Sequence, residues 1–212
     1  MPETSTLVLF VVAAMALLLI PGPVVLYTVA RSINQGRRAG FVSVLAAGVG
    51  DLCHVIAATL GLSAILLSSA LAFSIVKYAG AAYLIYLGVR TLMTRPDPDQ
   101  QVSAAPQRLA QIFSQGMVVS VLNPKTALFF LAFLPQFVQP ARGAASLQIL
   151  VFGLIFVGLG IATNSIYALL AGSAGAWLKG SRAFLQGQRY FAGGVYIVLG
   201  LTTALTGSQK SR

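Results

Sequence analysis

Charged side chains are scarce in this chain. Of its 212 residues only 8% are Asp, Glu, Lys or Arg, whereas 57% are hydrophobic. A soluble domain carries about 25% charged residues, so this chain has too little polar surface to cover a core of such apolar content. The same apolar content excludes an intrinsically disordered chain. The composition therefore predicts an integral membrane protein.

Cysteine and histidine are also nearly absent, with one residue of each, Cys53 and His54. A single cysteine cannot form an internal disulfide or a multi-thiolate metal site, and membrane redox enzymes need paired thiols. With a single histidine and no convincing nucleophile elbow, hydrolase chemistry lacks support as well. We therefore expect a protein that is not an enzyme and that uses no metal and no cofactor.

Long apolar runs are the main feature that is present. They differ from the alternating segments of about ten residues that mark a membrane β-barrel. A helix needs about 20 apolar residues to cross the hydrocarbon core. We predict an all-α integral membrane protein with six transmembrane helices, at residues 4–30, 41–64, 73–92, 112–133, 147–171 and 190–205.

Positive charge is concentrated in alternate connections between these spans. Fourteen Lys and Arg against four Asp and Glu give a formal charge of +10. Most lie in or near the first, third and fifth connections: Arg31, Arg37, Arg38, Arg90, Arg95, Arg108, Lys179, Arg182 and Arg189. The positive-inside rule places these connections in the cytoplasm and both termini outside, in the periplasm. The excess charge thus indicates topology. Membrane lipid headgroups are a compatible partner, and nucleic acid is not expected.

A polar linker divides the chain into two halves. We predict a first three-helix repeat at 1–94, a cytoplasmic linker at 95–110 and a second three-helix repeat at 111–212. When the second half is shifted onto the first by 103 residues, Pro124 falls on Pro21, Gly143 on Gly40 and Gly153 on Gly50. Later in the halves, a shift of 113 residues places Tyr196 on Tyr83. Because each half has three spans, the repeats would be inverted, as in many secondary transporters. Chance matches among small and apolar residues are the alternative.

Prolines interrupt the first and fourth predicted spans, at Pro21-Gly22-Pro23 and at Asn123-Pro124. Proline removes a backbone donor and disfavours helix for the residue before it. After each break a half-helix begins near the midplane, where its free N–H groups and positive dipole end favour an anion. We therefore predict that helices 1 and 4 are broken, with a kink tolerated for packing as the alternative.

Asp51 and Lys125 fall in the middle of predicted spans. A charged side chain at this depth costs about 2.5–3.5 kcal/mol on insertion scales, and such residues mark substrate or proton pathways. Asp51 is a candidate for binding an α-ammonium or a coupling proton, and Lys125 for binding an α-carboxylate. A structural ion pair is the alternative. His54 shares a helical face with Asp51 and is either a proton relay or a hydrogen-bonded structural residue.

At these residues the sequence resembles the LysE (lysine exporter) family, specifically its homoserine/threonine-resistance branch. The matching motifs are Pro21-Gly22-Pro23, Gly36-Arg37-Arg38-Ala39-Gly40, Gly50-Asp51, Gly80-Ala81-Ala82-Tyr83-Leu84, Asn123-Pro124-Lys125-Thr126-Ala127-Leu128-Phe129-Phe130 and Leu134-Pro135-Gln136-Phe137. The resemblance implies a bacterial plasma-membrane exporter of amino acids or related metabolites, driven by the proton motive force. One position departs from the family, which usually has Asn where this chain has Val24. Asn164 in the fifth span is a candidate for supplying that polar contact instead.

We thus expect a secondary transporter that exports amino acids or similar zwitterions, with the proton as coupling ion. The predicted substrate site comprises Pro21, Gly22, Pro23, Val24, Asp51, Asn123, Pro124 and Lys125, and the predicted proton-coupling residues are Asp51 and His54. Two alternatives stay open: a divalent metal-ion transporter of the wider superfamily, and a structural membrane protein without transport. Asp51 is the one carboxylate within the predicted spans, whereas a hard divalent cation needs several oxygen ligands, which disfavours the metal-ion alternative. Glycines at 193, 194 and 200 suit helix packing within the chain or in a homodimer equally.

Overall fold

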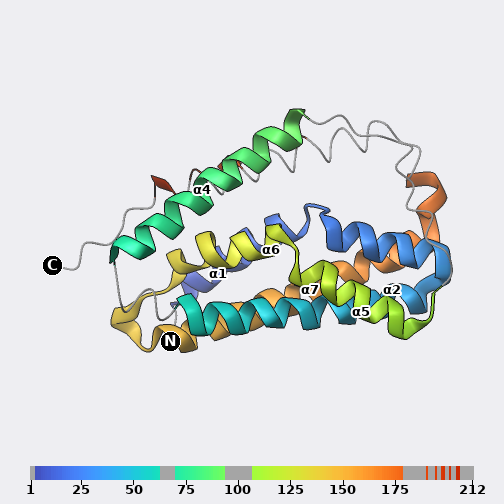
Figure 1. Cartoon of the computed structure of the whole chain (residues 1–212), viewed down its shortest axis with the longest axis horizontal. Helices are drawn as coiled ribbons and strands as arrows, with labels where there is room; N and C mark the ends of the chain where they lie inside the picture. Colours follow the sequence, from blue (N-terminus) through green and yellow to red (C-terminus); the bar gives the residue numbers. More distant parts are fainter. Residues whose placement is uncertain are drawn as a thin grey trace.

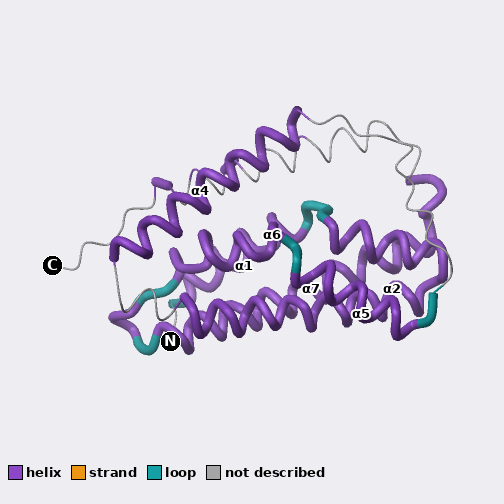
Figure 2. The backbone as a smooth tube through the Cα atoms, in the orientation of Figure 1, coloured by secondary structure: helices purple, strands orange, loops and turns teal. Residues whose placement is uncertain are grey.

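The computed structural model describes residues 3–62, 70–93 and 107–178, together with seven single residues between 190 and 205. The predicted sixth span and most of the linker therefore lie outside the described residues. The regular elements of the described part are all helical (Figures 1 and 2). The all-α prediction is thus confirmed for this part of the chain.

The helices follow the predicted spans closely. In chain order they are α1 (Thr4–Leu18), α2 (Pro23–Ala57), the π-helical turn η1 (Ala58–Leu62), α4 (Ala70–Met93), α5 (Leu109–Val121), α6 (Pro124–Leu128), the π-helical turn η2 (Phe129–Phe133), the 3₁₀ turns η3 (Leu134–Phe137) and η4 (Pro140–Arg142), and α7 (Ala145–Leu178). Three described segments are long and apolar enough to cross a membrane: Pro23–Gly61, Leu109–Phe137 and Ala145–Ala171.

Both predicted breaks are present. The first separates α1, which ends at Leu18, from α2, which begins at Pro23. The second separates α5, which ends at Val121, from α6, which begins at Pro124. Proline is favoured as the first residue of a helix because its missing N–H has no intrahelical partner there. Pro23, rather than Pro21, is therefore the structural counterpart of Pro124.

Helix α2 consists of two arms joined at Gly36. The backbone of Gly36 has φ 81° and ψ 177°, a conformation that glycine adopts without the steric cost of a Cβ. The arms meet closely beyond this joint, because a Cβ placed on Gly40 would lie 2.8 Å from Ser32 Oγ. Gly143, with φ 133°, occupies the corresponding place before α7. Each broken helix is thus followed by a glycine joint and a second helix.

The two broken helices pack antiparallel along their length. Contacts on one side of the breaks join Gln35 Nε2 to Gln107 O at 2.7 Å and the Tyr27 hydroxyl to Ile112 O at 2.8 Å. On the other side, the rings of Phe10 and Phe137 lie 5.3 Å apart. Figure 1 shows α1 and α6 in one half of the molecule and α5 in the other, with the breaks between them. An inverted repeat requires this relation, but without the sixth span the full six-helix repeat stays a prediction.

A cluster of phenylalanine rings fills the half of the molecule that contains α1. The rings come from α1, η2, η3 and α7: Phe10, Phe129, Phe130, Phe133, Phe137, Phe152 and Phe156. All seven side chains are at most 5% exposed. An exposed ion pair between Glu3 and Arg142 lies at the outer end of this half, with a nitrogen–oxygen distance of 2.5 Å. The cluster therefore separates this end of the molecule from the helix breaks.

Candidate functional site

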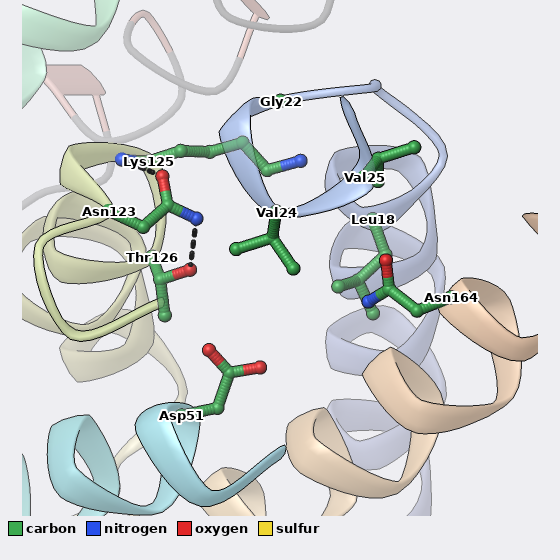
Figure 3. Close-up of a pocket in the computed structure, with 9 residues that line it drawn as sticks. All are labelled: Leu18, Gly22, Val24, Val25, Asp51, Asn123, Lys125, Thr126 and Asn164. Atoms are coloured by element: carbon green, nitrogen blue, oxygen red, sulfur yellow. Dashed lines mark hydrogen bonds between the residues drawn. The ribbon is translucent and has the colours of Figure 1, made fainter. Parts of the chain in front are cut away.

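A small cavity lies where the two helix breaks meet. Its lining residues come from α1, α2, the two breaks, α6 and α7: Leu18, Gly22, Val24, Val25, Asp51, Asn123, Lys125, Thr126 and Asn164 (Figure 3). The cavity measures about 20 Å³, which is room for about one water molecule. A larger ligand can bind there only if the surrounding helices move apart.

The Lys125 side chain ties the second break to the first. Its Nζ donates to Leu17 O at 2.9 Å and to Ile20 O at 2.6 Å, at the end of α1. Carbonyls at a helix C-terminus lack intrahelical donors and carry the negative end of the dipole, so an ammonium group is favourable there. Lys125 is 6% exposed. Two of its three N–H groups are thus used within the protein, which leaves one for a ligand.

Asn123 caps the helix that Lys125 begins. Its Oδ1 accepts the backbone N–H of Lys125 at 3.2 Å, and its Nδ2 donates to Thr126 Oγ1 at 2.9 Å. Asparagine is a preferred N-cap because its side chain satisfies a free N–H of the first turn. The break at Asn123-Pro124 is therefore stabilised by its own side chains, and part of the anion-binding capacity predicted for it is already used.

The first break, in contrast, leaves its new helix uncapped. Gly22 is the N-cap of α2 and provides no side-chain hydrogen bond. The first helical residue, Pro23, has no N–H, so the free backbone donors of the first turn belong to Val24 and Val25. Both residues line the cavity. The Lys125 side chain passes over Gly22, where an added Cβ would lie 3.4 Å from Lys125 Cδ. Donors thus border this side of the cavity.

Asp51 supplies the negative charge of the cavity. It is 5% exposed, and its Oδ1 accepts the Ser120 hydroxyl at 2.8 Å. The same hydroxyl lies 3.0 Å from Ala47 O, yet it has one proton and can donate to only one acceptor at a time. The described residues contain no ion pair between Asp51 and Lys125. The two charges therefore border one cavity without neutralising each other through direct contact.

Close packing of α2 against α5 brings Ser120 to Asp51. A Cβ added to Gly50 would lie 2.5 Å from Ser120 Cβ, closer than real side chains approach. Glycine at this position therefore permits the contact between the two helices. Gly50, which directly precedes Asp51 in the sequence, thus lets the Ser120 hydroxyl come close enough to donate to the Asp51 carboxylate.

His54 lies outside the cavity lining. Its Nε2 is 3.1 Å from Ser120 O, and its ring is stacked on Phe130 with the ring centroids 6.2 Å apart. These contacts join α2 to the second broken helix, as the structural alternative for His54 predicts. Ser120 contacts His54 through its backbone carbonyl and Asp51 through its hydroxyl, so these two contacts do not form a path for a proton between His54 and Asp51.

The structure brings most of the predicted site residues together. Gly22, Val24, Asp51, Asn123 and Lys125 all line the cavity, while the three predicted prolines form the breaks that create it. Sequence reasoning did not assign lining positions to Leu18, Val25 or Thr126. For Leu18 and Val25 the reason is that an apolar residue near a proline break is expected equally in a cavity lining and in contact with lipid.

Arg31 is buried between helices rather than exposed in a loop. The charge pattern assigns it to a cytoplasmic connection, but its side chain is only 5% exposed. Its guanidinium donates to Gln115 Oε1 at 3.2 Å and to Gln35 Oε1 at 3.3 Å, and it lies 5.3 Å above the centre of the Tyr27 ring. Arg31 thus joins the first arm of α2 to α5, and its assignment to the cytoplasmic side stays a prediction.

Comparison with known proteins identifies the family of the chain. Residues 15–207 match the family described as LysE type translocator. The chain belongs to the LysE type translocator family. Membership in a transporter family and the apolar helices of the structure make it a multi-pass membrane protein, and the resemblance found in the sequence is confirmed.

Relatives of this translocator span nearly the whole chain. A homoserine/homoserine lactone efflux protein of Salmonella typhimurium is 30% identical over 92% of this chain and 94% of its own length. An uncharacterized membrane protein of Vibrio cholerae is 25% identical over the same shares of both chains. A third, YrhP of Bacillus subtilis, is 28% identical over 95% of this chain and 99% of its own. No solved structure gives a significant match.

Proposed function

We propose that this translocator exports small amino-acid-type zwitterions across the bacterial plasma membrane in exchange for protons. The observation that supports the proposal is the cavity between the helix breaks, which combines a buried carboxylate with free backbone donors. A zwitterion presents one cation and one anion a few bonds apart, so it complements both walls. The name of the Salmonella relative supports homoserine as a representative zwitterion and its lactone, which keeps only the ammonium charge, as a related substrate.

The carboxylate end of the substrate would bind at the start of α2. The N–H groups of Val24 and Val25 are uncapped there, and a helix N-terminus attracts anions through these groups and its dipole. The remaining N–H of Lys125 Nζ borders the same wall. A lactone or other neutral carbonyl would accept the same donors.

The ammonium end would bind Asp51. One carboxylate oxygen, Oδ1, is held by Ser120, and the other, Oδ2, has room beside it because Gly160 has no side chain. A Cβ added to Gly160 would lie 3.5 Å from this oxygen. An ammonium group at Oδ2 would therefore complete the hydrogen bonding of the carboxylate.

The Ser120 hydroxyl lets Asp51 exist both with and without a proton. When Asp51 is ionised, Ser120 donates to it. When Asp51 is protonated, the carboxyl can donate to Ser120, which then donates to Ala47 O at 3.0 Å. Neither state leaves the hydroxyl proton without an acceptor. Because a proton and an ammonium group compete for the same negative charge, loading one would release the other, which is the exchange that proton-driven export requires.

The predicted topology assigns a side of the membrane to each half of the molecule. With both termini in the periplasm, Glu3 and Arg142 lie on the periplasmic side, and Arg37, Arg38 and Arg108 lie on the cytoplasmic side. The phenylalanine cluster then closes the periplasmic half of the molecule. Export would require this cluster to part after substrate has entered from the cytoplasm. The small volume of the cavity agrees with a closed state between these steps.

Purified protein in liposomes tests this function. We expect labelled L-homoserine trapped inside to leave faster when the outside is made acidic, and a protonophore should remove the acceleration. Empty liposomes provide the background rate. If homoserine efflux stays at background while Mn²⁺ crosses in a protein-dependent manner, the metal-ion alternative replaces the proposal. If neither moves, the protein has no transport activity of either kind.

A further inference from the structure

Asn164 presents an unused acceptor to the cavity. Its side chain comes from α7 and is 6% exposed, and it is one of the nine residues around the cavity (Figure 3). Its Oδ1 is buried and has no hydrogen-bond partner among the described residues. Buried polar atoms in native structures are nearly always paired, so an orphan acceptor in a cavity indicates a missing donor.

The free atom is the amide oxygen rather than the nitrogen. Asn164 Nδ2 donates to Gly160 O at 2.9 Å. Rotating the amide by half a turn would replace this bond with two oxygens facing each other, neither of which can donate. The contact with Gly160 therefore fixes the orientation of the amide, and the group left for a ligand is an acceptor.

A second free acceptor borders the same cavity. Residues 160 and 164 are four apart on α7 and so share a helical face. Gly160 lies next to Asp51 Oδ2, and the other carboxylate oxygen is occupied by Ser120. Asp51 from α2 and Asn164 from α7 thus each contribute one oxygen acceptor. Val24, which also lines the cavity, adds only an apolar side chain.

We infer that Asn164 is a specificity-determining residue that accepts a second N–H of the substrate's ammonium group, while Asp51 accepts the first. The inference rests on the proposed function and adds the substrate class, which is a compound with at least two N–H donors on a cationic nitrogen. Primary ammonium groups have three such donors and N-methyl derivatives have two. An N,N-dimethyl derivative has one, so it leaves one of the two acceptors unpaired, and N-acylation removes the charge as well.

The inference is tested by comparing the transport rates of L-homoserine and its N-methylated derivatives. In liposomes that contain the wild-type protein, we expect L-homoserine and its N-methyl derivative to be transported well. The N,N-dimethyl derivative should be transported about tenfold less well or worse, the usual effect of one unpaired buried acceptor. In Asn164→Leu, which has a similar volume and no acceptor, this ratio should fall below about threefold. Asn164→Ala, which also has no side-chain acceptor, provides a second variant if the leucine protein does not fold.

Thr163→Val is the matched control. Thr163 is the neighbouring residue on α7 and does not line the cavity, and its hydroxyl lies 2.8 Å from Leu159 O and 3.1 Å from Gly160 O. We expect it to keep the wild-type ratio. If the Asn164 variants lower transport of all three compounds equally, Asn164 has only a structural role and the inference is wrong. Absence of homoserine transport by the wild-type protein would instead refute the proposed function itself.

Discussion

Asp51→Asn is expected to abolish export while leaving the fold intact. The amide has nearly the same volume as the carboxylate, and its oxygen can still accept the Ser120 hydroxyl that Asp51 accepts at 2.8 Å. It carries no charge, however, so neither a proton nor an ammonium group gains an ionic partner. Removing one partner of a buried charge pair costs about 2–5 kcal/mol, which corresponds to a loss of export of at least about thirtyfold.

The measurement is homoserine efflux from liposomes at equal protein content, with the melting temperature of each variant in detergent as the test of folding. Asp51→Glu keeps the charge and should retain part of the activity. His54→Gln separates the two roles predicted for His54. A structural role predicts retained export, because Gln can also donate to Ser120 O, whereas a relay predicts a loss as large as that of Asp51→Asn. Wild-type export by Asp51→Asn would contradict the assignment of Asp51.

Lys125→Met is expected to reduce stability and export together. The variant removes the ammonium donor from Ile20 O, which Lys125 contacts at 2.6 Å, and Leu17 O then keeps only the backbone N–H of Ile20. An unsatisfied buried acceptor costs about 1–3 kcal/mol. Because about 1 kcal/mol lowers the melting temperature of a chain of this size by about 2–4 °C, the middle of this range, about 2 kcal/mol, corresponds to a decrease of about 4–8 °C.

Arg142→Met is the control for loss of a positive charge. Arg142 pairs with Glu3 at the surface, where both side chains are nearly half exposed, and such pairs contribute about 0–1 kcal/mol. Its melting temperature should therefore stay within about 2–4 °C of the wild-type value. If Lys125→Met has the stability of the wild-type protein and loses only export, Lys125 acts on the substrate alone and does not hold the two breaks together.

The helix breaks could be predicted from the sequence because their cause is local. Proline lacks an N–H and restricts the residue before it, so Pro23 and Pro124 determine where α2 and α6 begin whatever surrounds them. The expected position of Asp51 and Lys125 near the middle of the membrane can likewise be predicted, because it depends only on the lengths of the apolar runs that contain them. These local and compositional signals were sufficient to locate the cavity.

Partners of polar atoms could not be predicted in the same way, because they depend on which helices meet. The sequence predicted Lys125 as an anion-binding group, yet its Nζ also serves the carbonyls at the end of α1. It assigned Arg31 to a connection and gave no sign that Gln35 and Gln115 bind this side chain. Nothing in the sequence around Ser120 indicates that it binds Asp51, because this contact arises only when α5 packs on α2.

The claim that substrate binds between the helix breaks is tested most directly by protection of a cysteine placed there. Cys53 is the single native cysteine, so Cys53→Ser gives a cysteine-free background for Val24→Cys in the cavity lining and for Ser5→Cys at the exposed start of α1. L-Homoserine should slow maleimide labelling of Val24→Cys and leave the labelling of Ser5→Cys unchanged. Equal labelling rates of Val24→Cys with and without homoserine, in a protein that still exports it, would contradict the account.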